Sequence, residues 1–109
     1  MLMAGNGFSA EQAMPLFAPD LGRLFGGASM QVHHGVWTVD GAEFKDRYAD
    51  GQLETGLKLT VSVMTEQLES ALLDLKTMIT RFNQTYDWQL QWIHTEVETV
   101  EQRHFQLSD

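Results

Sequence analysis

The chain of 109 residues contains no cysteine, which excludes disulfide bonds, thiolate metal sites and a cysteine nucleophile. Basic residues are scarce as well: 7 Lys and Arg stand against 15 Asp and Glu, so the net charge is −8. Binding to nucleic acid or to anionic lipid requires clustered Lys and Arg. We therefore expect no direct contact with nucleic acid or a membrane, and a partner of complementary charge would be a basic protein.

Long apolar runs are also missing, because no stretch approaches the roughly 18 apolar residues of a membrane-spanning helix. The first residues lack the basic segment and the continuous apolar segment of a secretion signal. These features predict a cytoplasmic location. At this length we expect a single domain over residues 1–109, with residues 1–8 flexible.

Helix-breaking residues are absent from the second half of the chain. All nine glycines and both prolines lie at or before Gly56. From Leu68 to Leu107, apolar residues recur at steps of three and four, which is the period of a helix. The sequence therefore predicts a long amphipathic C-terminal helix from residue 66, following Thr65 as its N-cap.

The N-terminal half carries signals for a short helix. Ser9 and Gln12 have the spacing of a capping box, but Pro15 and Pro19 are expected to interrupt the helix that follows. A second start at Pro19 would end at Gly26. We predict only a short helix in this region.

Two segments have the alternation of β-strands. Residues 30–39 alternate with a change of phase at Gly35, which is typical of a bulge. Residues 56–64 alternate without interruption, with Leu57 and Leu59 on one side and Lys58 on the other. Together with the helices, they predict an α+β fold with a small antiparallel sheet that has one polar face.

The segment after Phe82 satisfies two patterns. The helix could continue to residue 107, about 60 Å at 1.5 Å per residue, and would then need a partner to cover it. Alternating aromatic residues from Tyr86 to Trp92 instead suggest a strand over residues 86–94. It would be followed either by a return strand through Phe105 and Leu107 in a C-terminal β-hairpin or by a helix capped at Thr95. The many β-branched residues after Thr95 count against the helix, and the missing turn residues count against the hairpin.

Two groups of residues are candidates for contacts. On a helix, Trp88 and Trp92 would be exposed unless a partner covers them, whereas on a strand they would join the core. The candidate contacts with a ligand or partner are Trp37, Leu73, Trp88, Trp92 and His94. A heptad-like spacing marks a candidate oligomer seam of Leu90, Ile93, Val97, Val100, His104 and Leu107.

Signals for catalysis or metal binding are weak. His33 and His34 are adjacent and would point to opposite faces of a strand, so they cannot readily share one ion. Neither a glycine-rich phosphate loop nor a serine in a nucleophile turn is present. We therefore expect no enzyme activity, no cofactor and no metal.

The leading hypothesis is a non-enzymatic interaction or assembly protein that forms a homo-oligomer through its C-terminal amphipathic segment. One alternative is a small-molecule binding protein with an aromatic pocket at a subunit interface. Another is an acidic inhibitor of a basic partner, of the kind that phages encode, with Glu96, Glu98 and Glu101 as its contact residues.

Overall fold

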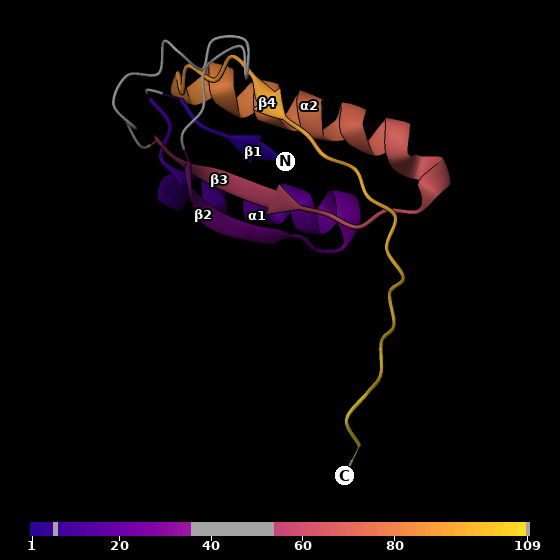
Figure 1. Cartoon of the computed structure of the whole chain (residues 1–109). Helices are drawn as coiled ribbons and strands as arrows, with labels where there is room; N and C mark the ends of the chain where they lie inside the picture. The colour runs from indigo at the N-terminus through magenta and orange to yellow at the C-terminus, as the bar shows by residue number, and fades with distance from the viewer. Residues whose placement is uncertain (6, 36–53, 109) are drawn as a thin grey trace.

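A computed structural model describes residues 1–5, 7–35 and 54–108, and these form an α+β fold. In chain order the elements are β1 (Leu2–Met3), α1 (Ala10–Phe25), β2 (Ser29–Gly35), β3 (Glu54–Thr60), the 3-10 turn η3 (Thr65–Gln67), α2 (Leu68–Tyr86) and β4 (Ile93–His94) (Figure 1). The predicted fold class is therefore confirmed. Residues 36–39 of the first predicted strand, with Trp37, lie outside the described residues.

Helix α1 is longer than the sequence suggested, because both prolines lie inside it. Its ends follow the predicted signals: Ser9 Oγ accepts a hydrogen bond from the Gln12 amide (3.3 Å), and Gly26 ends the helix in the left-handed conformation at φ 75°. The expected interruption at Pro15 and Pro19 is wrong. Both prolines are on the exposed side of α1, where water can satisfy the carbonyl groups that lose their helical partners.

The sheet has the strand order β2-β3-β1-β4, and all its pairs are antiparallel. The long ladder joins β2 to β3 over seven residue pairs, from Ser29 opposite Thr60 to Gly35 opposite Glu54. This confirms the antiparallel pairing of the two predicted strands. Residues 61–64, expected to extend the second one, lie after the end of β3.

Strand β1 was not expected from the sequence, which predicts that residues 1–8 are flexible; in the structure Leu2–Met3 is a paired strand. This strand pairs with β3 on one side and with β4 on the other. Next to it, the Met1 amino group donates to the Leu59 carbonyl (3.0 Å), and the Leu59 amide donates to the Met1 carbonyl (2.8 Å). Met3 is fully buried. Burial of this side chain and backbone pairing on both sides together hold β1 in the sheet, although the strand is too short to show an alternating pattern in the sequence.

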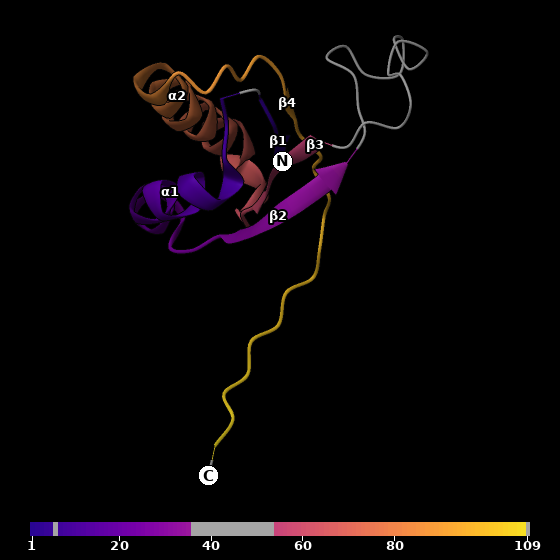
Figure 2. The same ribbon diagram turned by 90° about the vertical axis from the view of Figure 1, so that its left-hand side faces the viewer.

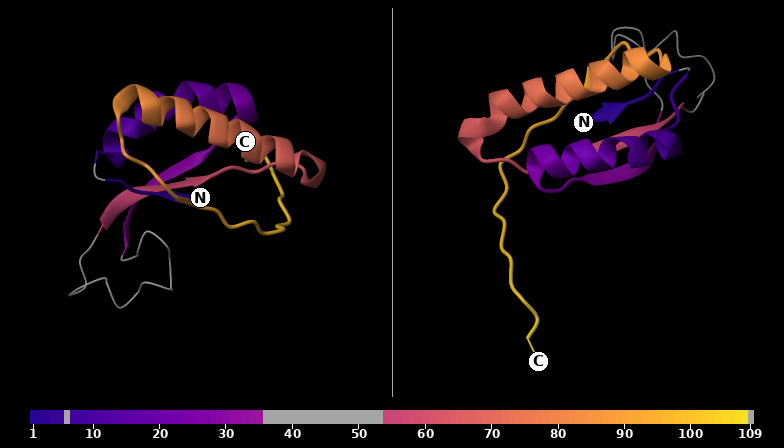
Figure 3. Two further views of the ribbon diagram at one scale, coloured as in Figure 1. Left: turned by 90° about the horizontal axis from the view of Figure 1, so that it is seen from above. Right: turned by 180° about the vertical axis from the view of Figure 1, so that it is seen from behind.

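Both helices lie on the same face of the sheet (Figures 2 and 3). The core fills the space between the two layers. Its most deeply buried large side chains are Met3, Phe17, Leu21, Leu57, Leu59, Leu75 and Trp88. Asp20 of α1 forms an ion pair with Arg81 of α2, and this pair joins the two helices at their outer surface. Asp20 also forms an ion pair with Arg23 of its own helix.

Helix α2 starts near the predicted position and stops at Tyr86, so its continuation to residue 107 is wrong. Asp87 adopts the left-handed conformation (φ 51°) and its amide bonds to the Asn83 carbonyl. The Asn83 side chain then donates to the Leu90 carbonyl (3.0 Å) and accepts from the Leu90 amide (2.9 Å). These bonds satisfy the open helix end and turn the chain back over the core.

Neither alternative for this region matches the structure. Of the predicted strand at 86–94, only Ile93–His94 pairs in the sheet, and the described residues after it contain no helix and no return strand. The β-branched residues that follow Thr95 have low helix propensity, and no turn residue is available to reverse the chain.

Candidate interaction surface

The chain continues beyond β4 as an extended segment, residues 95–108, which we call the C-terminal arm. It runs along the body and then leaves it, so that its last residues stand well away from the sheet and helices (Figure 1). A hydrogen bond from Gln102 Nε2 to Ser62 Oγ (2.6 Å) joins the arm to the body. All described residues of the arm are exposed.

The arm carries large apolar side chains in spite of this exposure. Phe105 is 83% exposed and Leu107 is 88% exposed, and Val97 and Val100 are each more than half exposed. Four exposed large apolar side chains on one segment indicate that the arm is available for a contact with a partner.

An extended conformation would divide the arm into two sides, because successive side chains of a strand point in opposite directions. One side would hold Val97, Thr99, Glu101, Arg103, Phe105 and Leu107. Within it, Glu101 and Arg103 form an ion pair (2.6 Å). The other side would hold Glu96, Glu98, Val100, Gln102, His104 and Gln106. Three of the six residues on the first side are apolar, against one of six on the second, and the apolar pair Phe105 and Leu107 lies at the end of the arm.

The oligomer seam expected on a C-terminal helix is divided in the structure. Leu90 is buried and Ile93 packs against the core from β4. The remaining members, Val97, Val100, His104 and Leu107, are exposed along the arm. The helical seam is therefore wrong as a structural prediction, although four of its six residues lie on the segment that is most available to a partner.

Trp88 was a candidate contact residue, but its side chain is only 3% exposed. Phe8 and Phe17 meet its ring edge-on, with centroids at 5.1 and 5.7 Å, while Tyr86 stacks on it at 5.4 Å. The structure therefore places Trp88 in the core, where a partner could not reach its side chain. The alternation of Trp88 with Leu90, both of them buried, was the sequence signal for its place in the core.

The other candidate contact residues within the described ranges are accessible. Trp92 is 64% exposed, and Leu73 is exposed to a similar degree on the outer side of α2. The exposed His94 places Nε2 at 3.2 Å from Glu96 Oε1. Leu73 belongs to α2, whereas Trp92 and His94 lie two residues apart at β4, so the three residues do not belong to one element.

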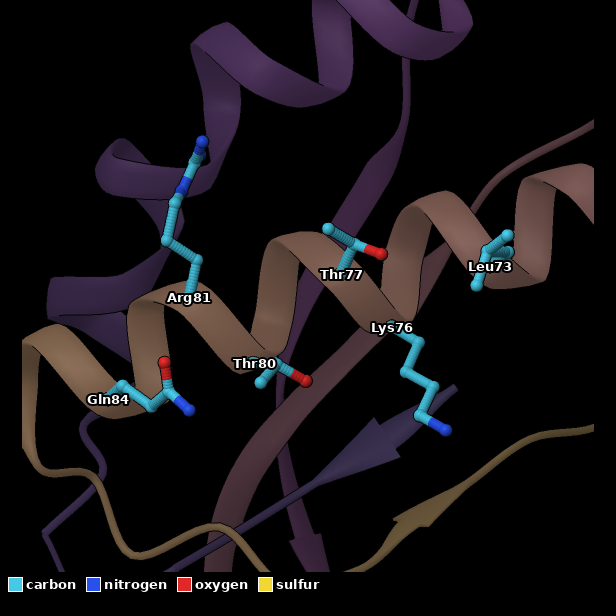
Figure 4. A pocket seen from close by; sticks show the side chains of 6 residues that line it. All are labelled: Leu73, Lys76, Thr77, Thr80, Arg81 and Gln84. Atoms are coloured by element: carbon cyan, nitrogen blue, oxygen red, sulfur yellow. The ribbon is translucent and has the colours of Figure 1, made fainter.

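A shallow hollow of about 380 Å³ lies on the outer side of α2 (Figure 4). All the residues that line it belong to this one helix: Leu73, Lys76, Thr77, Thr80, Arg81 and Gln84. Leu73 is the single large apolar member, and Arg81 is engaged by Asp20. A hollow made by one helix cannot enclose a small molecule, because ligand sites bury most of the ligand surface between several elements.

The outer edge of β2 is a further feature, which the sequence reasoning missed. Among the described residues, β2 pairs only with β3, so its other edge is not covered by a strand. Ser29–Gly35 contains no Lys, Arg, Asp, Glu or Pro, the residues with which edge strands usually prevent pairing with another chain. The absence of these residues between 29 and 35 was readable from the sequence.

Over the ranges that the structure describes, no three His, Asp or Glu side chains are grouped so that they could hold a metal ion. Within the same part of the chain, no helix combines the length and the apolar composition needed to cross a membrane. No protein-family model matches the chain, and no curated protein or solved structure is significantly similar to it. The functional argument therefore depends on the surface features described above.

Proposed function

We propose that this chain is a non-enzymatic assembly protein that binds further copies of itself through its C-terminal arm. The observation that carries this proposal is the exposure of Val97, Val100, Phe105 and Leu107 on one extended segment. The arm contributes little to the core of its own chain, so its apolar residues are available for a contact between chains.

Burial of the apolar side chains of the arm would supply favourable free energy for this contact. Complete burial of a Val, Leu or Phe side chain stabilises by about 1.5–3 kcal/mol. Backbone hydrogen bonds made by the arm would add to this gain. We expect association in the micromolar range of protein concentration.

The test compares the full chain with two variants of the arm. In the first variant, Val97, Val100, Phe105 and Leu107 are all replaced by Ser. The matched control carries conservative changes at three polar arm positions, Thr95→Ser, Thr99→Ser and Ser108→Thr. Analytical ultracentrifugation across micromolar concentrations should find oligomers for the full chain and the control, and monomers for the first variant. A full chain that stays monomeric throughout this range would refute the proposal.

An acidic inhibitor of a basic protein is a second candidate, because Glu96, Glu98 and Glu101 are exposed on the same arm. Attraction between the arm and a basic surface would weaken strongly with salt, whereas apolar self-association would not. Sedimentation of the full chain alone and mixed with a basic test protein, each at low and at high salt, therefore separates the two functions. The cytoplasmic location and the lack of enzyme activity stay predictions from the sequence.

A further inference from the structure

We propose that the arm of one copy binds the outer edge of β2 in a second copy and adds a strand to its sheet. This inference rests on the proposed function and names the surface that receives the arm. Strand addition is a common mode of peptide recognition, in which backbone hydrogen bonds supply affinity and alternate side chains supply specificity.

The edge of β2 has the properties of an acceptor. It offers seven residues in extended conformation without a charged residue or a proline to oppose pairing. Val32 is 37% exposed, whereas Leu57, its partner across the ladder, is fully buried. Since both side chains are on the face that the helices cover, the exposure of Val32 arises at the outer edge, where a neighbouring strand would lie.

The spacing of apolar residues in the arm matches this edge. Phe105 and Leu107 are two residues apart, as are Met30 and Val32 of β2. If Phe105 and Leu107 lie beside these two residues on the helix-covered face, Gln106 lies opposite Gln31 on the polar face. This pairing of the two glutamines is the same whether the added strand is parallel or antiparallel, because each is the central residue of its triplet.

The position of the arm limits the kinds of assembly. The arm follows β4 at one edge of the sheet, while β2 is at the other edge. Each copy therefore donates from one edge and accepts at the opposite edge. Contacts of this kind produce closed rings or open filaments when they run head to tail, and a two-fold dimer when two copies exchange their arms reciprocally. We expect oligomers whose size shows which of these arrangements forms.

Cross-linking tests the contact directly, because the chain has no cysteine of its own. Two single variants, Gln31→Cys and Gln106→Cys, are mixed and treated with a short thiol-to-thiol linker. We expect a product that contains one chain of each variant, identified by mass spectrometry. In the comparison mixture, Thr77→Cys on the hollow of α2 replaces Gln31→Cys, and little product is expected.

Matched charge substitutions provide a second measurement. Val32→Lys places a charge at the proposed contact and should reduce the association constant of the full chain by about tenfold or more. Leu73→Lys makes the same kind of change on the outer side of α2 and should alter the constant less than about twofold. Circular dichroism checks that both variants keep the fold.

The outcomes separate this inference from the function on which it rests. Oligomers that cross-link through Thr77→Cys, or that ignore Val32→Lys, would overturn the β2 contact while keeping self-association through the arm. A chain that carries both Gln31→Cys and Gln106→Cys and cross-links only within itself would overturn the role of a second copy. A full chain without oligomers would refute the proposed function itself.

Discussion

Gly56 of β3 provides the sharpest test of how β1 is held in the sheet. A Cβ atom at this position would lie 2.2 Å from the Met3 carbonyl oxygen and 3.1 Å from the Ala4 Cβ. Ordinary contacts to Cβ begin near 3.4 Å, so Gly56→Ala requires the two backbones to separate by about 1 Å. Neither atom belongs to a flexible side chain that could move aside. The substitution should therefore break the pairing of β1 with β3.

The cost follows from the contacts that this separation removes. About two backbone hydrogen bonds would be lost, at roughly 1 kcal/mol each. Partial exposure of the buried Met3 adds about 1 kcal/mol or more. We expect Gly56→Ala to lower the free energy of unfolding by about 2–4 kcal/mol, a large part of the 5–15 kcal/mol that is typical of a domain.

Urea unfolding followed by circular dichroism measures this change, and Gly22→Ala is the matched control. Gly22 lies within α1, and no heavy atom is within 4 Å of the position of its added Cβ. The same substitution should there raise the free energy of unfolding by about 0.5–1 kcal/mol, because alanine favours a helix. All variants are compared at equal protein concentration, since association also affects stability. If Gly56→Ala unfolds within 0.5 kcal/mol of the unmodified chain, the reasoning about β1 is refuted.

Three further predictions concern the turn after α2, the core and the ion pairs. Trp88→Ala should lower the free energy of unfolding by about 3–5 kcal/mol, whereas Trp92→Ala should change it by less than about 0.5 kcal/mol, and equal losses would contradict the burial of Trp88. Gln89 has a left-handed backbone (φ 60°), which is strained for a residue with a side chain. Gln89→Gly should therefore raise the free energy of unfolding by up to about 1 kcal/mol in the same urea assay. A lower free energy of unfolding would contradict this strain. The hydrogen bond from Arg23 and the charge of Arg81 lower the pKa of Asp20. The stability that comes from this lowered pKa is present at neutral pH and is lost as the pH falls through the folded-state pKa. Asp20→Asn should therefore make the free energy of unfolding less sensitive to acid. An unchanged pH profile of the free energy of unfolding would count against these ion pairs.

Local patterns predicted the elements whose own residues determine them. The alternation of Leu57 and Leu59 indicated β3, and Ser9 and Gly26 marked the two ends of α1. Position in the fold decided the rest. Pro15 and Pro19 fit within α1 because they face solvent, which no helical period could reveal. The end of α2 depends on Asn83 binding the backbone of Leu90 and on Trp88 entering the aromatic core.

The candidate site was predicted in part. The sequence singled out Val97, Val100 and Leu107, but on a helical seam, because their spacing fits a heptad. The shorter alternation of Phe105 with Leu107 is typical of a strand and supported the hairpin alternative, but the structure pairs neither residue within its own sheet. The edge of β2 could not be identified from sequence alone, because strand order in a sheet depends on pairing between distant segments. The other two strands of the sheet, β1 and β4, have two residues each and are too short to show an alternating pattern in the sequence.

The pairing of Leu2 with His94 has a consequence for how the chain folds. Nearly the entire chain separates these two partners, so β1 can receive its second neighbour only after the C-terminal segment has been synthesised. Contacts between such distant residues form slowly, because a long loop must close before they stabilise the fold. Until then one side of β1 stays open, and during synthesis the N-terminal strand offers an unpaired edge to other chains.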